Sequence, residues 1–473
     1  MFGSLETKVV FLAFCLLVSL TLNDVKSGSI LAEENKIDYK LAKEINFDKP
    51  VSKVIFATAE KDGKEFLYPK TIVFKDEVQF RDEEGNIAAS VPVDGRVHTS
   101  KQGKFIGIEK SVIPPEAQEK YPDDAYKSAM KYLTVYNDEG KEVWHSNEPI
   151  ASAEETYSIL ISNNDGSAIV PRLDYGGIDF YNSNGEPRTV EPFGRVGWAR
   201  RGGCDDRSED GEYYVIIAEE LPLMRYKDLP GKSTNPWLIL YQKNGDELWR
   251  KALKEYIGDN VLISSTGKYV LGYGHTMAGV GKGIASRELF LYNKEGKSIL
   301  TNATRFQVVG FSPDECYVSI ADENRVFLIE SGSGKVLFEK QLPPEVEAKY
   351  ITREVETRTG KRTVQEKIIP YRISGVFVSS EGENVLVRVH KAYQRPTDIE
   401  IKSRAEAIAH YEQYMKQFGH SEIFLLDRNG DTIWRKFYPP SEAAPTLIAV
   451  SGDAKQIAFS FGDNKIEILD REF

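Results

Sequence analysis

The feature that most constrains this chain is a polar turn that recurs along its length. In YLTVYNDEGKEVWHSN at 132–147, WLILYQKNGDELWRKA at 237–252 and IFLLDRNGDTIWRKF at 423–437, an apolar run leads to a turn that ends in Gly, and Trp follows four residues later. The turn occurs seven times, with its glycine at Gly85, Gly140, Gly185, Gly245, Gly296, Gly334 and Gly430. This internal repeat predicts a structure of similar units, with the Trp side chains filling the space between neighbouring sheets.

A second turn alternates with the first. It opens with Ser, is rich in Asp, Asn and Gly, and leads into an apolar strand, as in SSTGKYVLGY at 264–273 and SPDECYVSI at 312–320. These residue types favour tight turns because their side chains bond the local backbone or tolerate positive φ. Seven turns of this kind are present, beginning near residues 99, 162, 208, 264, 312, 379 and 451.

The alternation of the two turns predicts units of four antiparallel strands, A to D. We expect an all-β fold, a seven-bladed β-propeller of four-stranded antiparallel blades, because closing the units into a ring removes exposed sheet edges. Eight blades are the alternative, since VIFATAEKDGKEFLY at 54–68 offers another strand pair. Strands from both ends of the chain are expected to share one blade, because Gly85 has no strong Ser-led turn before it and only KIEILDREF follows the turn at Ser451.

The repeats resemble those of known propellers. IFLLDRNGDTIW, LTVYNDEGKEVW and LILYQKNGDELW resemble the repeat of the pyrroloquinoline-quinone-like propeller superfamily, and SPDECYVSIAD resembles a turn of WD40-like and TolB-like bacterial propellers. The resemblance covers nearly all of residues 50–473 and implies the architecture rather than an activity. Quinone-dependent dehydrogenases would also require adjacent cysteines and a calcium site, which the sequence does not show. No cofactor and no metal site are therefore predicted.

The N-terminus indicates export. A run of 14 apolar or small residues, VVFLAFCLLVSLTL, follows Lys8 and is shorter than the roughly 20 residues that span a bilayer, so residues 1–27 are predicted to be a signal peptide. Residues 28–49 then form an N-terminal extension and 50–473 the propeller. We expect an extracytoplasmic protein, periplasmic or secreted, with an uncleaved membrane anchor as the alternative. Beyond the signal only Cys204 and Cys316 remain, which indicates isolated thiols rather than a disulfide framework.

Long insertions separate some of the predicted strands. They occupy 111–131, 219–236, 275–288 and 391–421 between strands B and C, and 342–372 between one unit's strand D and the next strand A. Because B–C and D–A connections of an antiparallel blade lie on one face, all five insertions are expected there, where loops on a rigid scaffold commonly bind ligands. SRAEAIAHYEQYMKQFG at 403–419 predicts an amphipathic helix lying on the propeller, and residues 350–371 predict a two-stranded finger.

Arginine opens several of the predicted A strands, at Arg96, Arg195, Arg305 and Arg372, and His98 lies beside Arg96. Several guanidinium groups around one axial mouth would bind a carboxylate, sulfate or phosphate through forked hydrogen bonds. The alternative is that each arginine pairs with a carboxylate of a neighbouring blade. No catalytic residue is assigned, because the histidines show no metal spacing and no nucleophile motif is present.

These features favour an exported binding or scaffolding module that recognises a protein, peptide or glycan through its insertion-bearing face. An enzyme is the less favoured alternative, as a channel-mouth lyase or hydrolase acting on an anionic sugar or lactone. A structural part of an envelope assembly is a third interpretation. The net charge of −11 repels phosphate backbones, so nucleic acid is not an expected partner, and no transmembrane segment is expected after removal of the signal.

Overall fold

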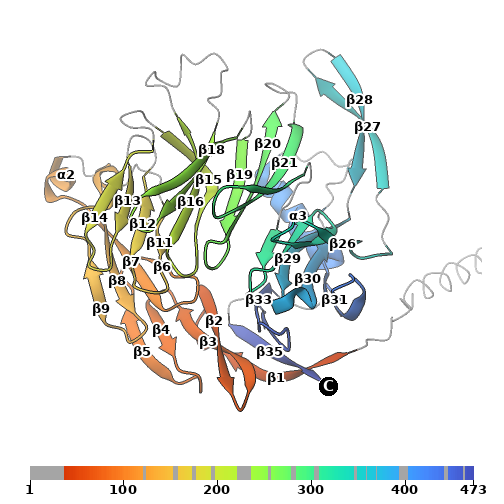
Figure 1. Cartoon of the computed structure of the whole chain (residues 1–473), viewed down its shortest axis with the longest axis horizontal. Coiled ribbons are helices and arrows are strands. Elements are labelled where there is room, and N and C mark those ends of the chain that lie inside the picture. The colour runs from red at the N-terminus through yellow and green to blue at the C-terminus, as the bar shows by residue number, and fades with distance from the viewer. Residues whose placement is uncertain are drawn as a thin grey trace, which may run out of the picture.

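The computed structural model describes residues 37–472, with several short gaps (Figure 1). The gaps are residues 121–123, 153–157, 173–176, 193–197, 221–235, 254–256, 278–283, 303–307, 346–348, 358–359, 369, 392, 394–402, 441–445 and 462–463. The predicted signal peptide, Arg195 and Arg305 therefore lie outside the described residues. No helix in the described part of the chain is long and apolar enough to cross a membrane.

Eight four-stranded antiparallel blades form a ring, with strand A of each blade innermost and strand D outermost (Figure 1). Blade 1 contains β2 (Lys53–Lys61), β3 (Lys64–Val73), β4 (Glu77–Arg81) and β5 (Ile87–Pro92); blade 2 contains β6 (Arg96–Thr99), β7 (Phe105–Val112), β8 (Met130–Asn137) and β9 (Glu142–His145). Blade 3 contains β11 (Leu160–Ile161), β12 (Ala168–Pro171), β13 (Ile178–Tyr181) and β14 (Pro187–Val190); blade 4 contains β15 (Trp198–Arg207), β16 (Tyr213–Glu220), β17 (Trp237–Gln242) and β18 (Glu247–Ala252). The short strand β10 (Ala151–Ser152) pairs with β8.

The second half of the ring repeats this order and then closes it. Blade 5 contains β19 (Ile257–Ile263), β20 (Tyr269–Met277), β21 (Ile284–Asn293) and β22 (Ser298–Asn302); blade 6 contains β23 (Val308–Phe311), β24 (Tyr317–Asp322), β25 (Arg325–Glu330) and β26 (Val336–Gln341). Blade 7 contains β29 (Tyr371–Val378), β30 (Asn384–Lys391), β31 (Ser421–Asp427) and β32 (Thr432–Tyr438). Blade 8 contains β33 (Thr446–Val450), β34 (Gln456–Ser460), β35 (Lys465–Glu472) and, as its outermost strand, β1 (Asp38–Asn46).

The predicted count of seven blades is wrong, and the alternative of eight is confirmed. Residues 54–68 contribute to β2 and β3, whose turn at Asp62 and Gly63 carries neither repeated signature. The blade around Gly85 therefore has its own A–B pair. Both chain ends do share one blade, as predicted, but the N-terminal contribution is β1, so the ring includes part of the segment 28–49 that was predicted to be an extension.

The close approach of neighbouring blades explains the Gly-to-Trp signature. Trp144 of blade 2 stacks on Tyr181 of blade 3, with ring centroids 5.5 Å apart and planes at 7°. Gly185, in the C–D turn of blade 3, has a φ of 79°, and a Cβ built there would lie 2.7 Å from the Trp144 ring. Glycine is thus required both for the left-handed turn and for the contact. The predicted packing of this Trp between sheets is confirmed.

The Ser-led turns stabilise each blade and join it to the next. Within the turn, the Ser264 hydroxyl accepts a hydrogen bond from the backbone N–H of Tyr269 at 3.0 Å, and the same pattern recurs at Ser312 with Tyr317. Hydrogen bonds at this end of the blades bridge all eight interfaces, between Thr71 and Gly103, Gln102 and Asn163, Asn163 and Glu209, Asp210 and Ser265, Thr266 and Glu315, Asp314 and Glu381, Ser380 and Gly452, and Gln456 and Leu67.

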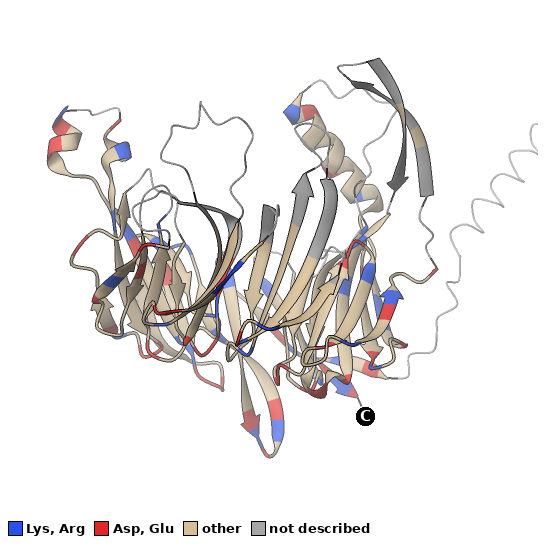
Figure 2. Ribbon diagram, turned by 45° about the horizontal axis from the view of Figure 1, so that its top comes forward, with Lys and Arg blue, Asp and Glu red and all other residues tan. Residues whose placement is uncertain are grey.

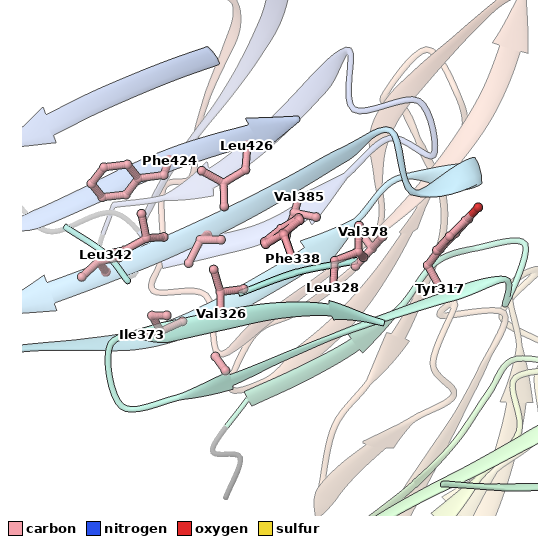
Figure 3. Packing of buried hydrophobic residues seen from close by; sticks show 13 residues of the cluster. Tyr317, Val326, Leu328, Phe338, Leu342, Ile373, Val378, Val385, Phe424 and Leu426 are labelled. Carbon is pink, nitrogen blue, oxygen red and sulfur yellow. The ribbon is translucent and has the colours of Figure 1, made fainter. Parts of the chain in front are cut away.

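The core lies between the blades rather than at the centre of the ring. Figure 3 shows one such cluster, in which Leu328 and Phe338 of blade 6 pack against Val385, Phe424 and other residues of blade 7. Similar clusters fill the other interfaces. Burying large apolar side chains on both faces of each blade fixes the blades relative to one another, which makes the ring a rigid scaffold.

The described insertions project from the same side of the ring (Figure 2). They include helix α2 (Pro115–Lys120) and the 3₁₀ helix η2 (Ala125–Ser128) on blade 2, and helix α3 (Arg404–Phe418) on blade 7. The connection between blades 6 and 7 contains the finger formed by β27 (Lys349–Thr357) and β28 (Gly360–Ile368). The A–B hairpin of blade 1 extends from the opposite side. The predicted helix and finger are confirmed, and Ser403 caps the helix by accepting a hydrogen bond from the backbone N–H of Glu406.

Candidate functional site

Exposed large apolar side chains occur in only two settings among the described residues. Six lie on outermost strands, namely Leu41, Ile87, Val143, Leu248, Val336 and Phe437. The other six lie at the insertions of blades 2 and 7, namely Val112, Ile113, Tyr126, Ile408, Tyr411 and Phe418. The described A–B and C–D turns carry none of them. The face that bears the insertions is therefore the more apolar of the two faces of the ring.

Helix α3 presents its apolar side chains outward. It was expected to lie on the propeller, but none of its side chains is buried. Tyr393, which precedes the helix, packs edge-on against Tyr411 and Tyr414 at 5.3 and 5.2 Å, and its hydroxyl lies 3.1 Å from Nδ1 of His410. This one aromatic side chain covers part of the helix, and Ile408 and Phe418 remain 48% and 47% exposed.

A partly buried ion network ties the connection before the finger to blade 7. Arg435 donates from Nε to Glu422 at 2.8 Å and from Nη2 to Glu345 at 2.5 Å. Glu345 belongs to the connection that leads to the finger, so this network ties the base of the finger to the blade. Burial raises the pKa of the Glu422 carboxyl, while Arg435 opposes that effect. His420 adds a contact of 3.0 Å between its Nε2 and the Tyr371 hydroxyl.

Arg96 and His98 lie on β6 of blade 2, beside a carboxylate. Arg96 is exposed and stands opposite Glu109 of β7 in the strand register. His98 Nε2 lies 2.9 Å from Glu109 Oε2, and Lys131 Nζ lies 3.7 Å from the same carboxyl group. His98 therefore contacts a carboxylate within its own blade, and Arg96 stands opposite the residue that carries it.

Arg372 has different surroundings. It is exposed at the start of β29 in blade 7, and its register partner on β30 is His390 instead of a carboxylate. Two residues earlier on β30, Arg388 faces the same side of the sheet. Arg388 Nη1 donates to Ser374 Oγ at 3.1 Å, where a bulge between Ile373 and Gly375 interrupts β29.

Three basic groups are thus gathered on the side of blade 7 that faces blade 8. Nε of Arg388 and Nδ1 of His390 are buried and make no hydrogen bond. Burial lowers the pKa of His390, and the nearby charges of Arg388 and Arg372 lower it further. Burial likewise lowers the pKa of Arg388. His390 is therefore held mainly neutral at neutral pH beside two permanent cations.

A pocket of about 230 Å³ opens beside Arg388. Its lining comes from the inner strands of three blades and from β30: Val308, Ser374, Gly375, Val376, Phe377, Arg388, Thr446, Ala449 and Val450. Val308 and Thr446 are the first residues of β23 and β33, and strand A of each blade begins on the insertion-bearing face. The pocket therefore lies in the channel wall and extends to the end of the ring that carries the insertions.

Sequence reasoning identified Arg372 but missed its two neighbours. Arg388 and His390 lie in NVLVRVHK, strand B of the repeat, where an apolar strand was expected. The alternation of basic residues at 388 and 390 with valine was the available signal, because such residues share one face of a strand. Their proximity to Arg372 depends on the pairing register, which the bulge in β29 sets.

No group of three or more His, Cys, Asp or Glu residues suited to a metal ion occurs in the part of the chain that the structure describes. Cys316 is an exposed free thiol. The side chain of Cys204 is among those the structure does not describe.

The comparisons with known proteins concern the fold alone. No known protein family and no curated protein matches the chain. Among solved structures, the chain is similar to BamB from Moraxella catarrhalis, with 11% identity and a TM-score of 0.45 over 92% of this chain and 100% of that chain. It is also similar to the C-terminal WD40 domain of Sif2, with 11% identity and a TM-score of 0.46 over 91% and 98% of the two chains. A third similar structure is the Dos1 propeller, with 10% identity and a TM-score of 0.45 over 91% and 95%.

Likenesses this distant carry no argument about activity or partners. The propeller is established by its own strand pairing, which confirms the fold-level resemblance predicted from the repeats.

Proposed function

We propose that this propeller is a binding module that recruits a protein or peptide partner through its insertion-bearing face. The observation that supports this proposal is the distribution of exposed apolar side chains. Among the side chains that the structure describes, those that are large, apolar and exposed outside the outermost strands lie at the insertions of blades 2 and 7. Exposed apolar and aromatic groups on a rigid scaffold favour protein partners, because such side chains dominate the binding energy of interfaces.

The two apolar groups stand on different parts of the ring (Figure 1). Val112, Ile113 and Tyr126 belong to blade 2, whereas Ile408, Tyr411 and Phe418 belong to blade 7. A partner that touches both would lie across the channel mouth. Stable interfaces bury about 800 Å² on each partner, which an elongated segment or a folded domain seated on this face would supply.

The experiment uses two variants of the full chain, each losing three exposed apolar side chains. The first carries Ile408→Ser, Tyr411→Ser and Phe418→Ser on α3. The matched control carries Val143→Ser, Leu248→Ser and Val336→Ser on outermost strands. Partners are cross-linked in native extract and quantified by mass spectrometry. We expect the first variant to lose a specific partner at least about tenfold, since the few side chains that anchor an interface each cost about 2 kcal/mol or more when they are truncated. Equal capture by both variants would refute the assignment of the surface.

We further infer that the protein works outside the cytoplasm, as a periplasmic or secreted module. Support comes from the 14-residue apolar run after Lys8, which fits a signal-peptide core. Cell fractionation with N-terminal sequencing tests this inference: the expected result is an extracytoplasmic protein that begins near residue 28. A cytoplasmic protein with an intact first residue would refute it.

A further inference from the structure

The side of blade 7 that faces blade 8 carries cations without carboxylate partners. The chain has 72 Asp and Glu residues against 61 Lys and Arg, so acidic groups are abundant. Yet Arg372 and Arg388 make no ion pair within the described residues, and the nearest register partner of Arg372 is His390. At the equivalent register position of blade 2, Arg96 stands opposite Glu109. Two unneutralised guanidinium groups in one place favour an anion supplied from outside the chain.

The other polar groups packed around His390 do not neutralise this charge. On β31 its register partner is Ser421, and on β32 the partner of Ser421 is Tyr438. Farther out on this face, the Lys436 ammonium lies 5.2 Å from the centre of the Tyr438 ring.

Blade 8 contributes no free charge to this site from its described residues. Thr446 is the polar residue that β33 brings to the pocket. On β35, Glu467 is engaged by Lys465 at 2.8 Å, and Lys465 also bonds Glu44. The groups that act on His390 are Arg388 and Arg372.

The free donors of Arg388 suit a carboxylate. Its Nη1 is used by Ser374, which fixes the guanidinium plane. Nε, which makes no hydrogen bond but is covered by neighbouring atoms, and the adjacent Nη2 form the guanidinium edge that pairs with the two oxygens of a carboxylate side by side, so binding requires the covering atoms to move aside. A monatomic anion such as chloride would offer this edge one acceptor instead of two.

The pocket limits the size of the group that carries the carboxylate. Its volume of about 230 Å³ lies below the roughly 300–1,000 Å³ of pockets for drug-sized ligands. Val308, Val376 and Phe377 give it apolar walls. A carboxylate on two or three carbons therefore fits in both size and polarity.

We propose that this pocket in the channel wall of blades 6 to 8 binds a carboxylate group, with Arg388 as the forked donor, Thr446 as a second hydrogen-bonding group and Arg372 as a long-range attraction. The proposal deepens the proposed function, since it names the chemistry that the binding face recognises. The bound carboxylate opposes the effect of both arginines on His390. Binding therefore takes up a proton at His390 and strengthens as the pH falls.

The test follows the six histidines of the full chain by NMR, with His390 assigned from a His390→Gln variant. Propionate is the probe, added at constant ionic strength. We expect propionate to raise the pKa of His390 and to bind at least about threefold more tightly at pH 5.5 than at pH 7.5, as linkage requires. Propionamide, which has the same shape without the charge, should have no effect.

Three substitutions separate the pocket from general charge effects. Arg388→Gln should weaken propionate binding at least about tenfold, because it removes a charged forked donor. Arg96→Gln, at the equivalent position of blade 2, should leave binding unchanged. Arg388→Lys keeps the charge without the fork and guards against a folding defect: its histidine spectrum should otherwise match the wild type while propionate binding falls. An unchanged His390 pKa, equal binding by Arg388→Gln, or tighter binding of sulfate than of propionate would overturn the proposal.

A blocked tripeptide, acetyl-Gly-Glu-Gly-amide, distinguishes the source of the carboxylate. Binding at least about tenfold tighter than propionate would identify a side chain of a peptide partner, and equal binding would identify a free small carboxylate. Either result supports a carboxylate pocket. The titration requires no partner, so loss of partner capture by the α3 variant with normal propionate binding would support both proposals separately.

Discussion

Arg207 supports a quantitative prediction about what holds neighbouring blades together. It is 3% exposed, in strand β15 of blade 4. Its guanidinium makes five hydrogen bonds, to the carbonyls of Leu160 and Ser167 and the hydroxyl of Ser167 in blade 3, and twice to the carbonyl of Gly211. The perturbation is Arg207→Met, which keeps an unbranched stem about as far as the position of Nε and removes every donor.

Two opposing effects set the size of the loss. Five hydrogen bonds from a charged donor, at about 1.5 kcal/mol each, contribute about 7.5 kcal/mol. Against this, burial lowers the pKa of Arg207 from 12.5 to about 10. Removing the buried charge returns about 3.5 kcal/mol, at about 1.4 kcal/mol for each pKa unit. The substitution should therefore reduce the free energy of unfolding by about 4 kcal/mol, within the range found when a buried charge network is broken.

Urea unfolding followed by tryptophan fluorescence measures the effect. With a denaturant dependence of about 2–3 kcal/mol per molar, the midpoint should fall by about 1.3–2 M. The control is Arg188→Met, which removes an exposed ion pair with Asp246 and should change stability by less than about 1 kcal/mol. If Arg207→Met lies within about 1 kcal/mol of the wild type, the hydrogen bonds do not outweigh the burial of the charge, and the reasoning is refuted.

Three further predictions concern the ring. Tyr39→Phe removes the hydrogen bond to the carbonyl of Ala454 within the closing blade and should lower stability by about 1–2 kcal/mol in the same urea assay. Gly185→Ala should lower the free energy of unfolding by more than about 2 kcal/mol, because it combines positive φ with a clash against Trp144. In a Trp144→Ala background the loss should be smaller, and equal losses in both backgrounds would contradict the contact. Burial lowers the pKa of His420 below its value in the unfolded chain, so the unfolded state binds more protons below about pH 6.5 and stability falls on acidification. In the His420→Gln variant the urea midpoint should therefore change less between pH 7.5 and pH 5 than it does in the wild type.

The ring was predictable because its turn residues carry the contacts between blades. Gly185 accepts the Trp144 ring, and the hydroxyl of Ser264 closes its own turn, so both residues leave a local mark in the sequence. The blade number was not predictable in the same way. The hairpin at Asp62 and Gly63 lies beyond the inter-blade contacts and needs only a tight two-residue turn, so it carries neither signature.

The candidate site was predictable only in part. The start of strand A marked Arg372, since an arginine there recurs along the chain. Nothing in a single sequence gives the register that places Arg372 opposite His390, or the bulge at Ser374 that orients Arg388. The pocket is less visible still, because its walls come from three blades that are far apart along the chain.

The contrast between blades 2 and 7 indicates how a repeat acquires a binding position. Both begin strand A with an arginine, and the residue opposite it on strand B decides what that arginine can do. In blade 2 it is Glu109, which also engages His98, so a carboxylate stands beside the positive charge within the blade. In blade 7 it is His390, which adds no negative charge and leaves the guanidinium groups able to attract an external anion. A His390→Glu substitution places in blade 7 the residue type that blade 2 has at this position. It should therefore abolish propionate binding while the fold is retained. Persistent binding would show that the residue opposite the arginine does not control the site.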